Sequence, residues 1–463
     1  MMIRGKVIVN FPWNKEGQTE QQYSLFEITE DEHNFLFSTE DYPAEMEWDL
    51  YCNKDSFRVD YLFCVDENDA PFTLYDCWIS LKELSGKGNT KTIWLISWNR
   101  ALLGLHVENE SDENIVSAEY IIETETGNPT YRMFIGKNEF WLHDDSVHIK
   151  TGWNQENSKF NGVIICVDLK TPMGIKDVEK IVLRLLEIYF LRVGFFPKIE
   201  KRKMWTEDGK TFLYWKEFAA YAKTAKRNIT LRRTLEINNR DYSLIYEKWW
   251  NIREREVVTF NLFAYLTTDN SPVIEIPIAT CIQCLEGYFG THHQNVLVKF
   301  SDDEKNQIVD EIAKTLANSD IVKEICENNG IRVADIISSV KGTTGRINKF
   351  SLREVIQYAI ERCDMTKKLF EYESSTVTRT GRTVLDIFLN KAKGHRDWLS
   401  HMMSHRKHQK NQFVNEQISF AMDKLKMLFR LSLMYDIGME VKEESLNDRI
   451  IEINQWYKDH DLV

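Results

Sequence analysis

The spacing of apolar and polar residues differs between the two halves of the chain. Upstream of about residue 240, short runs rich in Val, Ile, Phe, Tyr and Trp are separated by clusters of Gly, Asn and Asp, which is typical of strands and turns. The clearest runs are GKVIVNF, DYLFCVD, FTLYDCWIS, KTIWLISW, YRMFIG, VHIKTGW and GVIICVDL. One helix is expected among them, at 176–192. We therefore predict a β-rich domain, sandwich or barrel-like, over residues 1–240.

Downstream of residue 240 the apolar residues recur at helical spacing. The predicted helices are 241–265, 274–293, 303–328 with a break, 351–371, 381–403, 411–436 and 443–458. All eight prolines lie at or before Pro277, which favours uninterrupted helices beyond it. In the longest helix one stripe is expected to be buried and Gly438 to end the helix; the stripe is Val414, Ile418, Ala421, Leu425 and Leu428. The fold class predicted is thus α+β and multidomain, with an all-α bundle over 241–463.

Length and composition agree with a multidomain protein of ordinary globular type. The 463 residues exceed what one compact core usually serves. No apolar run approaches the roughly 18 residues of a membrane-spanning helix, and the first residues lack a signal-peptide layout. We therefore expect a cytoplasmic protein with no membrane partner, whose eight cysteines are reduced thiols.

The net charge of -12 disfavours general polyanion binding, but the charge is unevenly distributed. Residues 1–60 carry 13 acidic and 5 basic side chains, whereas 391–410 carry 6 basic and 1 acidic. Residues 196–233 carry 11 basic and 4 acidic side chains, interleaved with aromatics. Two interpretations of 196–233 stay open: a solvated connector between domains, or a track for nucleic acid.

The basic segment 391–410 also holds four of the eleven histidines, in KAKGHRDWLSHMMSHRKHQK. Imidazole titrates near neutral pH and can move a proton to or from a ribose hydroxyl, while a guanidinium binds phosphate and its developing charge. Within this segment Arg396 precedes His401 by five positions, and Asp397 follows the arginine directly. This combination suits cleavage of a phosphodiester.

The Arg396-x4-His401 spacing, late in a helical region, resembles the signature of the HEPN superfamily: Arg, four to six residues, then His, with a polar residue often directly after the Arg. The order of helices around it, with the upstream segment IPIATCIQCLEGYFGTHH, is similar to the ApeA-like branch of HEPN proteins. The resemblance covers roughly residues 270–440, and the β-rich region only by general character. The best-known form of the motif has Asn after the Arg, where this chain has Asp397.

The resemblance implies a metal-independent endoribonuclease that acts as a homodimer or higher homo-oligomer, needs no cofactor and leaves a cyclic phosphate end. Arg396 would contact the scissile phosphate and His401 would act in acid/base catalysis. It further implies a role in bacterial defence, in which the protein cuts host RNA, with tRNA as one candidate, once a phage protein is sensed by the N-terminal region. The alternative is a non-catalytic HEPN-like module that binds RNA or protein.

Helical geometry adds detail to this assignment. Five steps place Arg396 and His401 about 140° apart on a straight helix, so the two would converge only at a bent helix start, relaxed by Gly394, or across an interface. Asp397 and His401 share a face, so the carboxylate is a candidate to orient the imidazole. The neighbouring His395, His405, Arg406 and Lys407 are expected to help hold RNA.

Other residues have both a structural and a functional interpretation. His401 and His405 have the spacing of two metal ligands on one helix face, but no third ligand is identifiable and no metal is expected. Cys281 and Cys284 lie in an apolar run, which favours core packing over zinc binding. Glu286 is expected to face solvent, or else to lie near the motif and tune His401.

Overall fold

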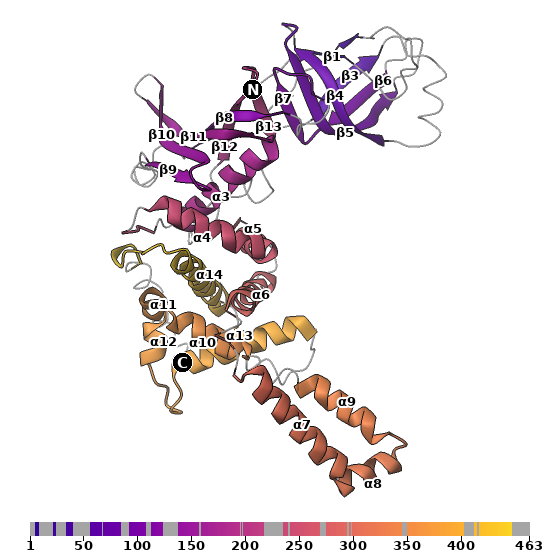
Figure 1. The fold of residues 1–463 in the computed structure, drawn as a ribbon, viewed down its shortest axis with the longest axis vertical. Helices are drawn as coiled ribbons and strands as arrows, with labels where there is room; N and C mark the ends of the chain where they lie inside the picture. Colours follow the sequence, from indigo (N-terminus) through magenta and orange to yellow (C-terminus); the bar gives the residue numbers. More distant parts are fainter. Residues whose placement is uncertain are drawn as a thin grey trace. The chain divides into compact units, whose positions relative to one another are not determined.

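The computed structural model describes residues 5–8, 22–24, 34–39, 56–66, 68–84, 92–107, 113–123, 138–156, 159–194, 196, 198–216, 235–238, 241–268, 275–293, 296–297, 299–344, 350–401, 412–413 and 416–446. The chain divides into two compact units. One comprises Met1–Ile188 and Phe196–Lys223, and the other Tyr189–Phe195 and Thr224–Val463. Figure 1 shows strands in the first unit and helices in the second.

The first unit is built on antiparallel strands, as its alternating apolar residues predict. The strands are β1 (Gly5–Ile8), β2 (Gln22–Ser24), β3 (Asn34–Thr39), β4 (Ser56–Asp66), β5 (Pro71–Leu84), β6 (Thr92–Ser97), β7 (Arg100–Leu103), β8 (Ile115–Glu123), β9 (Asn138–Leu142), β10 (Val147–Glu156), β11 (Lys159–Met173), β12 (Lys198–Thr206) and β13 (Thr211–Lys216). They pair in the order β2-β1-β4-β5-β7-β13-β12-β8-β11-β10-β9, and β6 joins β3 to β5. The predicted β-rich N-terminal region is confirmed; its run YRMFIG lies outside the described residues.

The predicted helix at 176–192 is α3 (Ile175–Val193). It packs on the sheet through the buried Val178, Val182 and Leu185. Glu179 fixes the contact, since it accepts a hydrogen bond from the Tyr120 hydroxyl at 2.8 Å and pairs with Arg202 Nε at 3.2 Å. Helix α3 is therefore anchored to the sheet at β8 and β12.

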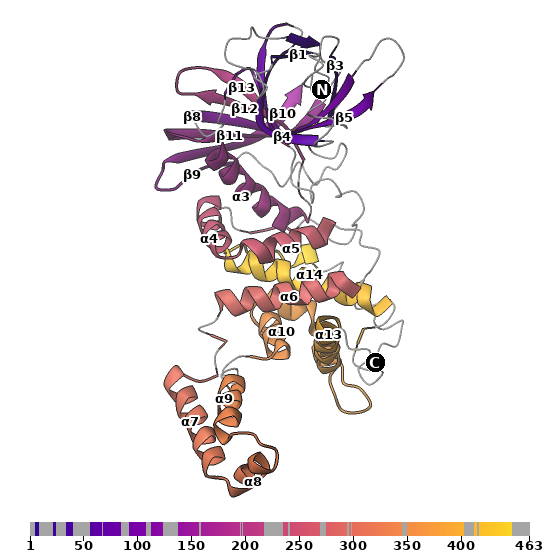
Figure 2. The same ribbon diagram turned by 90° about the vertical axis from the view of Figure 1, so that its right-hand side faces the viewer.

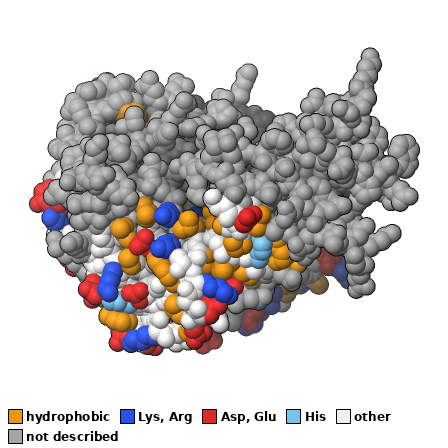
Figure 3. Space-filling view, turned by 90° about the horizontal axis from the view of Figure 1, so that it is seen from above, with side chains coloured by type: hydrophobic (Ala, Val, Ile, Leu, Met, Phe, Trp, Pro, Cys, Tyr) orange, Lys and Arg blue, Asp and Glu red, His pale blue; other side chains and the backbone are white. Residues whose placement is uncertain are grey.

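The interpretation of 196–233 as a solvated connector is wrong for residues 198–216, which form the hairpin β12–β13, whereas the nucleic-acid track stays a prediction. Arg202, counted among the basic residues, is only 4% exposed and is neutralised by Glu179. Strand alternation turns such a side chain inward. In the view of Figure 3, acidic, basic and apolar side chains are interspersed over the described part of the surface.

The second unit is all-helical, as predicted. Its helices are α4 (Tyr242–Arg255), α5 (Val257–Thr268), α6 (Glu275–His292), α7 (Asp302–Asn318), α8 (Asp320–Asn328), α9 (Val333–Thr344), α10 (Leu352–Glu361), α11 (Asp364–Leu369), α12 (Glu371–Ser375), α13 (Val384–His401) and α14 (Glu416–Asp436). The helices α7, α8 and α9 form an extension beside the others (Figures 1 and 2). Among the described residues, no helix is long and apolar enough to cross a membrane.

Helix α6 lies at the centre of this unit and contacts α5, α10, α13 and α14 (Figure 2). Its sequence explains the position, because its apolar residues cover most of the circumference, leaving only the side of Gln283, Gly287 and Gly290 exposed, and can pack against several neighbours at once. The buried set is Ile278, Ala279, Cys281, Ile282, Cys284, Leu285, Tyr288 and Phe289. The prediction that Cys281 and Cys284 fill the core is confirmed.

Helix α14 follows the predicted stripe, since Ile418, Ala421, Leu425 and Leu428 are at most 5% exposed; Val414 lies outside the described residues. Its end is also the predicted one. Gly438 has φ +82°, its N–H donates to the Tyr435 carbonyl at 3.0 Å, and the Met439 N–H donates to the Met434 carbonyl at 2.8 Å. These two bonds form a Schellman motif, which needs a left-handed residue and therefore favours glycine.

Candidate active site

The motif Arg396-x4-His401 lies in the second half of α13. Thr383 starts this helix by accepting the Asp386 N–H at 3.0 Å, as an N-cap does. From there a buried stripe runs along Val384, Phe388, Ala392 and His395. Arg396 and Asp397, which follow His395, are therefore turned away from the stripe, and both side chains are partly exposed.

Arg396 is held by two carboxylates. Its Nη2 donates to Glu286 Oε1 of α6 at 3.0 Å, and its Nη1 donates to Asp397 Oδ1 at 2.8 Å. The arginine side chain is 22% exposed, so its guanidinium lies at the edge of the bundle rather than inside it. Each of the two sequence interpretations of Glu286 holds in part, since its side chain is 43% exposed and its carboxylate also reaches the motif, where it pairs with Arg396. An effect of Glu286 on His401 stays a prediction.

Asp397 also binds a second cation. Its Oδ2 accepts from Lys393 Nζ at 2.8 Å, one turn earlier on α13. Lys393, Arg396, Asp397 and Glu286 therefore form a cluster with no net formal charge. The predicted contact between Asp397 and His401 stays a prediction, because the side chain of His401 lies outside the described residues.

His395 occupies a different environment from the one expected. Its side chain is 1% exposed, and its ring lies 5.8 Å from that of Trp398 and 6.3 Å from that of Phe413. A side chain at this depth packs the core and cannot reach an RNA strand at the surface. The other three expected RNA contacts, His405, Arg406 and Lys407, lie outside the described residues.

The backbone of α13 is helical from Val384 without a break to His401, its last residue. Arg396 and His401 thus lie well beyond the first turns of α13, so convergence at a bent helix start is wrong for this chain. Gly394 lies inside the helix. On an uninterrupted helix, positions 396 and 401 lie about 140° apart around the axis and therefore on different sides of it.

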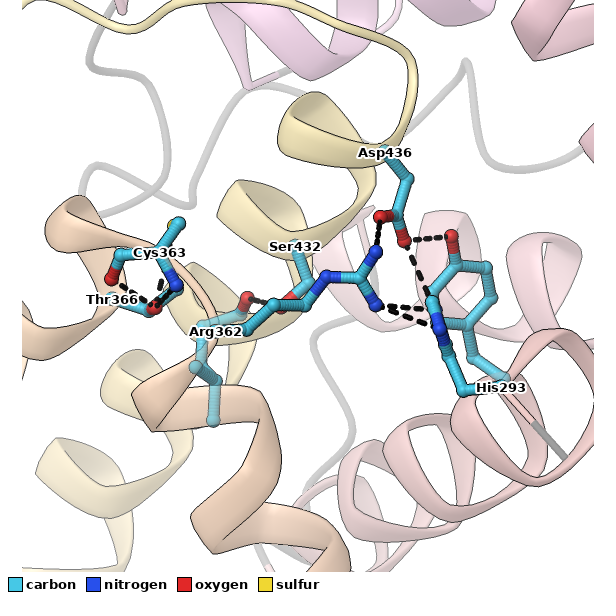
Figure 4. A network of polar contacts seen from close by, with 8 residues as sticks. His293, Arg362, Cys363, Thr366, Ser432 and Asp436 are labelled. Atoms are coloured by element: carbon cyan, nitrogen blue, oxygen red, sulfur yellow. Dashed lines mark hydrogen bonds and ion pairs between the residues drawn. The ribbon is translucent and has the colours of Figure 1, made fainter. Parts of the chain in front are cut away.

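A second polar cluster lies where α6, α10 and α14 end, and Figure 4 shows Arg362 pointing from the end of α10 toward its partners. Arg362 pairs with Asp436, and its Nη1 lies 2.6 Å from His293 Nε2. Asp436 also accepts from the Tyr288 hydroxyl at 2.5 Å and lies 3.3 Å from His293 Nε2. All three helix C-termini carry partial negative charge, which the guanidinium of Arg362 offsets.

The cluster around Arg362 is largely buried: the Arg362 and Asp436 side chains are 17% and 8% exposed. Burial, together with the Asp436 charge, raises the pKa of Tyr288 well above its usual value, so the phenol stays a hydrogen-bond donor. A pocket of about 480 Å³ adjoins the cluster, lined by 362–365, Leu431, Tyr435, Asp436 and 438–441. Because each polar group is engaged by another, we interpret the cluster as a tie between three helices.

Sequence reasoning missed this second cluster. Arg362 and His293 are 69 residues apart, and Arg362 and Asp436 are 74 apart. His293 and Asp436 end predicted helices, but Arg362 lies in the middle of the predicted helix 351–371, so no sequence signal could have grouped the three residues. Among the residues that the structure describes, no group of three or more His, Cys, Asp or Glu side chains is arranged to hold a metal ion.

Comparison with known proteins places the motif within a family. Residues 280–443 match the family model of the Apea-like HEPN domain, a segment that begins in α6, contains α13 with Arg396 and His401, and ends after α14. No curated protein and no solved structure matches the chain. HEPN domains are commonly ribonucleases, which links this segment to a nuclease or RNA-related role in defence. The helical unit of this chain therefore contains an Apea-like HEPN domain.

Proposed function

We propose that this protein is a metal-independent endoribonuclease that cuts host RNA, with tRNA as one candidate substrate, during abortive-infection defence against phage. The observation that carries the proposal is the Arg396-x4-His401 motif inside the segment that matches the Apea-like HEPN family. No cofactor is needed for this chemistry, since imidazole and guanidinium groups supply the proton transfer and the charge stabilisation.

In the proposed reaction Arg396 contacts the scissile phosphate and His401 transfers a proton to or from the 2′-hydroxyl or the leaving oxygen. Attack of the 2′-oxygen on phosphorus releases a 5′-hydroxyl end and leaves a 2′,3′-cyclic phosphate. The partial exposure of Arg396 supports access to RNA. Because positions 396 and 401 lie on different sides of α13, we further propose that two copies of the chain form a homodimer and supply the groups together.

Asp397 has a supporting role in this proposal. It holds Arg396 Nη1 at 2.8 Å and is itself held by Lys393, so it can fix the guanidinium before RNA arrives. Residues 241–463 would form the nuclease domain and residues 1–240 a sensor or regulatory domain. A phage protein is the proposed trigger, and His405, Arg406 and Lys407 the proposed additional RNA contacts.

The proposal is tested by incubating the purified protein with RNA in the presence of EDTA and determining the chemistry of the product ends. We expect cleavage with cyclic phosphate ends. His401→Ala should abolish cleavage while RNA binding and the thermal unfolding midpoint are kept, and His408→Ala in the same segment serves as the matched control. Cleavage that persists in His401→Ala, or that requires a divalent metal, would refute the assignment.

A second candidate function is a non-catalytic HEPN-like module that binds RNA or a protein. It is favoured by the neutral charge of the Lys393–Arg396–Asp397–Glu286 cluster, because a site paired in this way attracts phosphate only weakly. RNA binding without cleavage, with and without infected-cell extract, would support this alternative.

A further inference from the structure

The guanidinium of Arg396 is only partly used by its carboxylate partners. Nε and Nη2 form one edge of this planar group, the edge that carboxylates and phosphates bind through two parallel hydrogen bonds. Glu286 uses only Nη2 of this edge, at 3.0 Å. Arg396 Nε is buried and has no hydrogen-bond partner among the described residues. Glu286 therefore binds one nitrogen of this edge and leaves the other, Nε, without a partner among the described residues.

The two carboxylates differ in how firmly they are held. Asp397 is 23% exposed, neighbours Arg396 on the same helix and has Lys393 as a second cationic partner. Glu286 is 43% exposed and comes from α6, and among the described residues Arg396 is the cation it pairs with. An anion that replaces Glu286 at Arg396 thus breaks one half-exposed ion pair. An anion that replaces Asp397 would break two ion pairs, those of Asp397 with Arg396 and with Lys393.

We propose that Glu286 occupies the phosphate-binding edge of Arg396 in the free protein and is displaced by the RNA phosphate, while Asp397 stays in place and positions the guanidinium. A phosphate can take both Nε and Nη2, so it gains a hydrogen bond that Glu286 does not make. The inference rests on the proposed function, since it takes RNA as the ligand of Arg396. Glu286 then acts as a built-in competitor that raises the RNA concentration needed for activity.

The magnitude follows from the exposure of the pair. Ion pairs that are partly accessible to solvent contribute modestly, so removal of the competing charge should change RNA affinity by about three- to fivefold. Glu286→Gln should lower KM and the dissociation constant for RNA by this factor and leave kcat unchanged. A role of Glu286 in positioning Arg396 would instead lower kcat. The advantage of the variant should shrink as salt is added, because this pair is open to solvent.

The experiment measures cleavage kinetics of the full-length protein, and RNA affinity in the His401→Ala background, where the RNA stays intact. Glu311→Gln removes the same charge from a residue that is 74% exposed and pairs with Lys314, and it should leave RNA affinity unchanged. In the Arg396→Ala background, Glu286→Gln should have no effect, because the competed group is gone. Thermal unfolding checks that each variant is folded.

The outcomes separate the two proposals. A wild-type protein that binds RNA but never cuts it overturns the nuclease assignment alone, and the affinity measurements still decide the role of Glu286. Equal effects of Glu286→Gln and Glu311→Gln, an effect that persists without Arg396, or a fall in kcat at constant KM would overturn the competitor role. A protein that binds no RNA overturns both.

Discussion

Replacing Asp436 by Asn tests whether the Arg362 cluster ties three helices together. The Asp436 carboxylate is 8% exposed and accepts from Arg362 and from the Tyr288 hydroxyl, with His293 Nε2 at 3.3 Å. An asparagine keeps the shape but removes the charge and presents an N–H₂ group to a site where donors already converge. Removing one partner of a buried ion pair costs about 3–5 kcal/mol, and the 17% exposure of Arg362 argues for the lower end.

A loss of ~3 kcal/mol should lower the melting temperature by roughly 6–12 °C for a unit of this size. Calorimetry and urea denaturation measure the loss, and Asp310→Asn is the control, since Asp310 is 62% exposed and pairs with Lys341 on the surface. A double-mutant cycle with Arg362→Met should show that the two losses do not add. A loss below about 1 kcal/mol for Asp436→Asn, or strictly additive losses, would refute the tie.

Three further predictions concern the same helical unit. Leu425→Ala, at a fully buried position of α14, should lower the free energy of unfolding by about 2–5 kcal/mol in urea denaturation. Gly438→Ala should cost about 1–2 kcal/mol in the same assay, because φ is +82° there and the added Cβ would lie 3.1 Å from Lys248 Nζ. Burial lowers the pKa of His292 despite the opposing charge of Glu256. The contribution of neutral His292 to the free energy of unfolding is therefore complete above pH 6.5, and it is lost as the pH falls through the lowered folded-state pKa. The pH dependence of unfolding between about pH 7 and 5 should therefore be shallower in His292→Gln.

The sequence predicted most helices because the apolar spacing that defines them is local. The prediction of one helix over 241–265 was wrong, since α4 ends at Arg255 and α5 begins at Val257. At the break lies Arg253, which is 2% exposed and donates to the carbonyls of Glu256 and Val257. Helical spacing cannot reveal such a bond. Helix α9 was missed, and the predicted helix 443–458 lies mostly outside the described residues.

The sequence predicted the motif but not its electrostatic surroundings. The composition of residues 391–410 is strongly basic. In the structure, however, Lys393 pairs with Asp397, and Arg396 pairs with Asp397 and with Glu286, which lies 110 positions away in the sequence. Net charge over a segment omits every charge that the fold brings from elsewhere. The burial of His395 could not be predicted from composition either. It depends on which face of α13 is buried, and His395 lies on the same face as Val384.

A last prediction concerns Lys424 of α14 and Glu373 of α12, which form an ion pair with both side chains fully buried. Burial lowers the pKa of Lys424, and Glu373 opposes this shift. In Glu373→Gln the opposing charge is gone, so the folded-state pKa of Lys424 falls further and the variant should lose about 3–5 kcal/mol at neutral pH.

The loss in Glu373→Gln should depend on pH in a defined direction. Where the unfolded chain binds a proton that the folded protein does not, stability rises with pH, so the variant should regain stability between the lowered pKa and the ordinary value of 10.5. Urea denaturation from about pH 7 to pH 10 measures this slope relative to the wild-type protein. The double variant Glu373→Leu with Lys424→Met should recover most of the loss, because an apolar pair leaves no buried charge unpaired. If the free energy of unfolding of Glu373→Gln did not change with pH, Lys424 would have found another partner. The ion pair of Lys424 and Glu373 would then not be what holds α12 against α14.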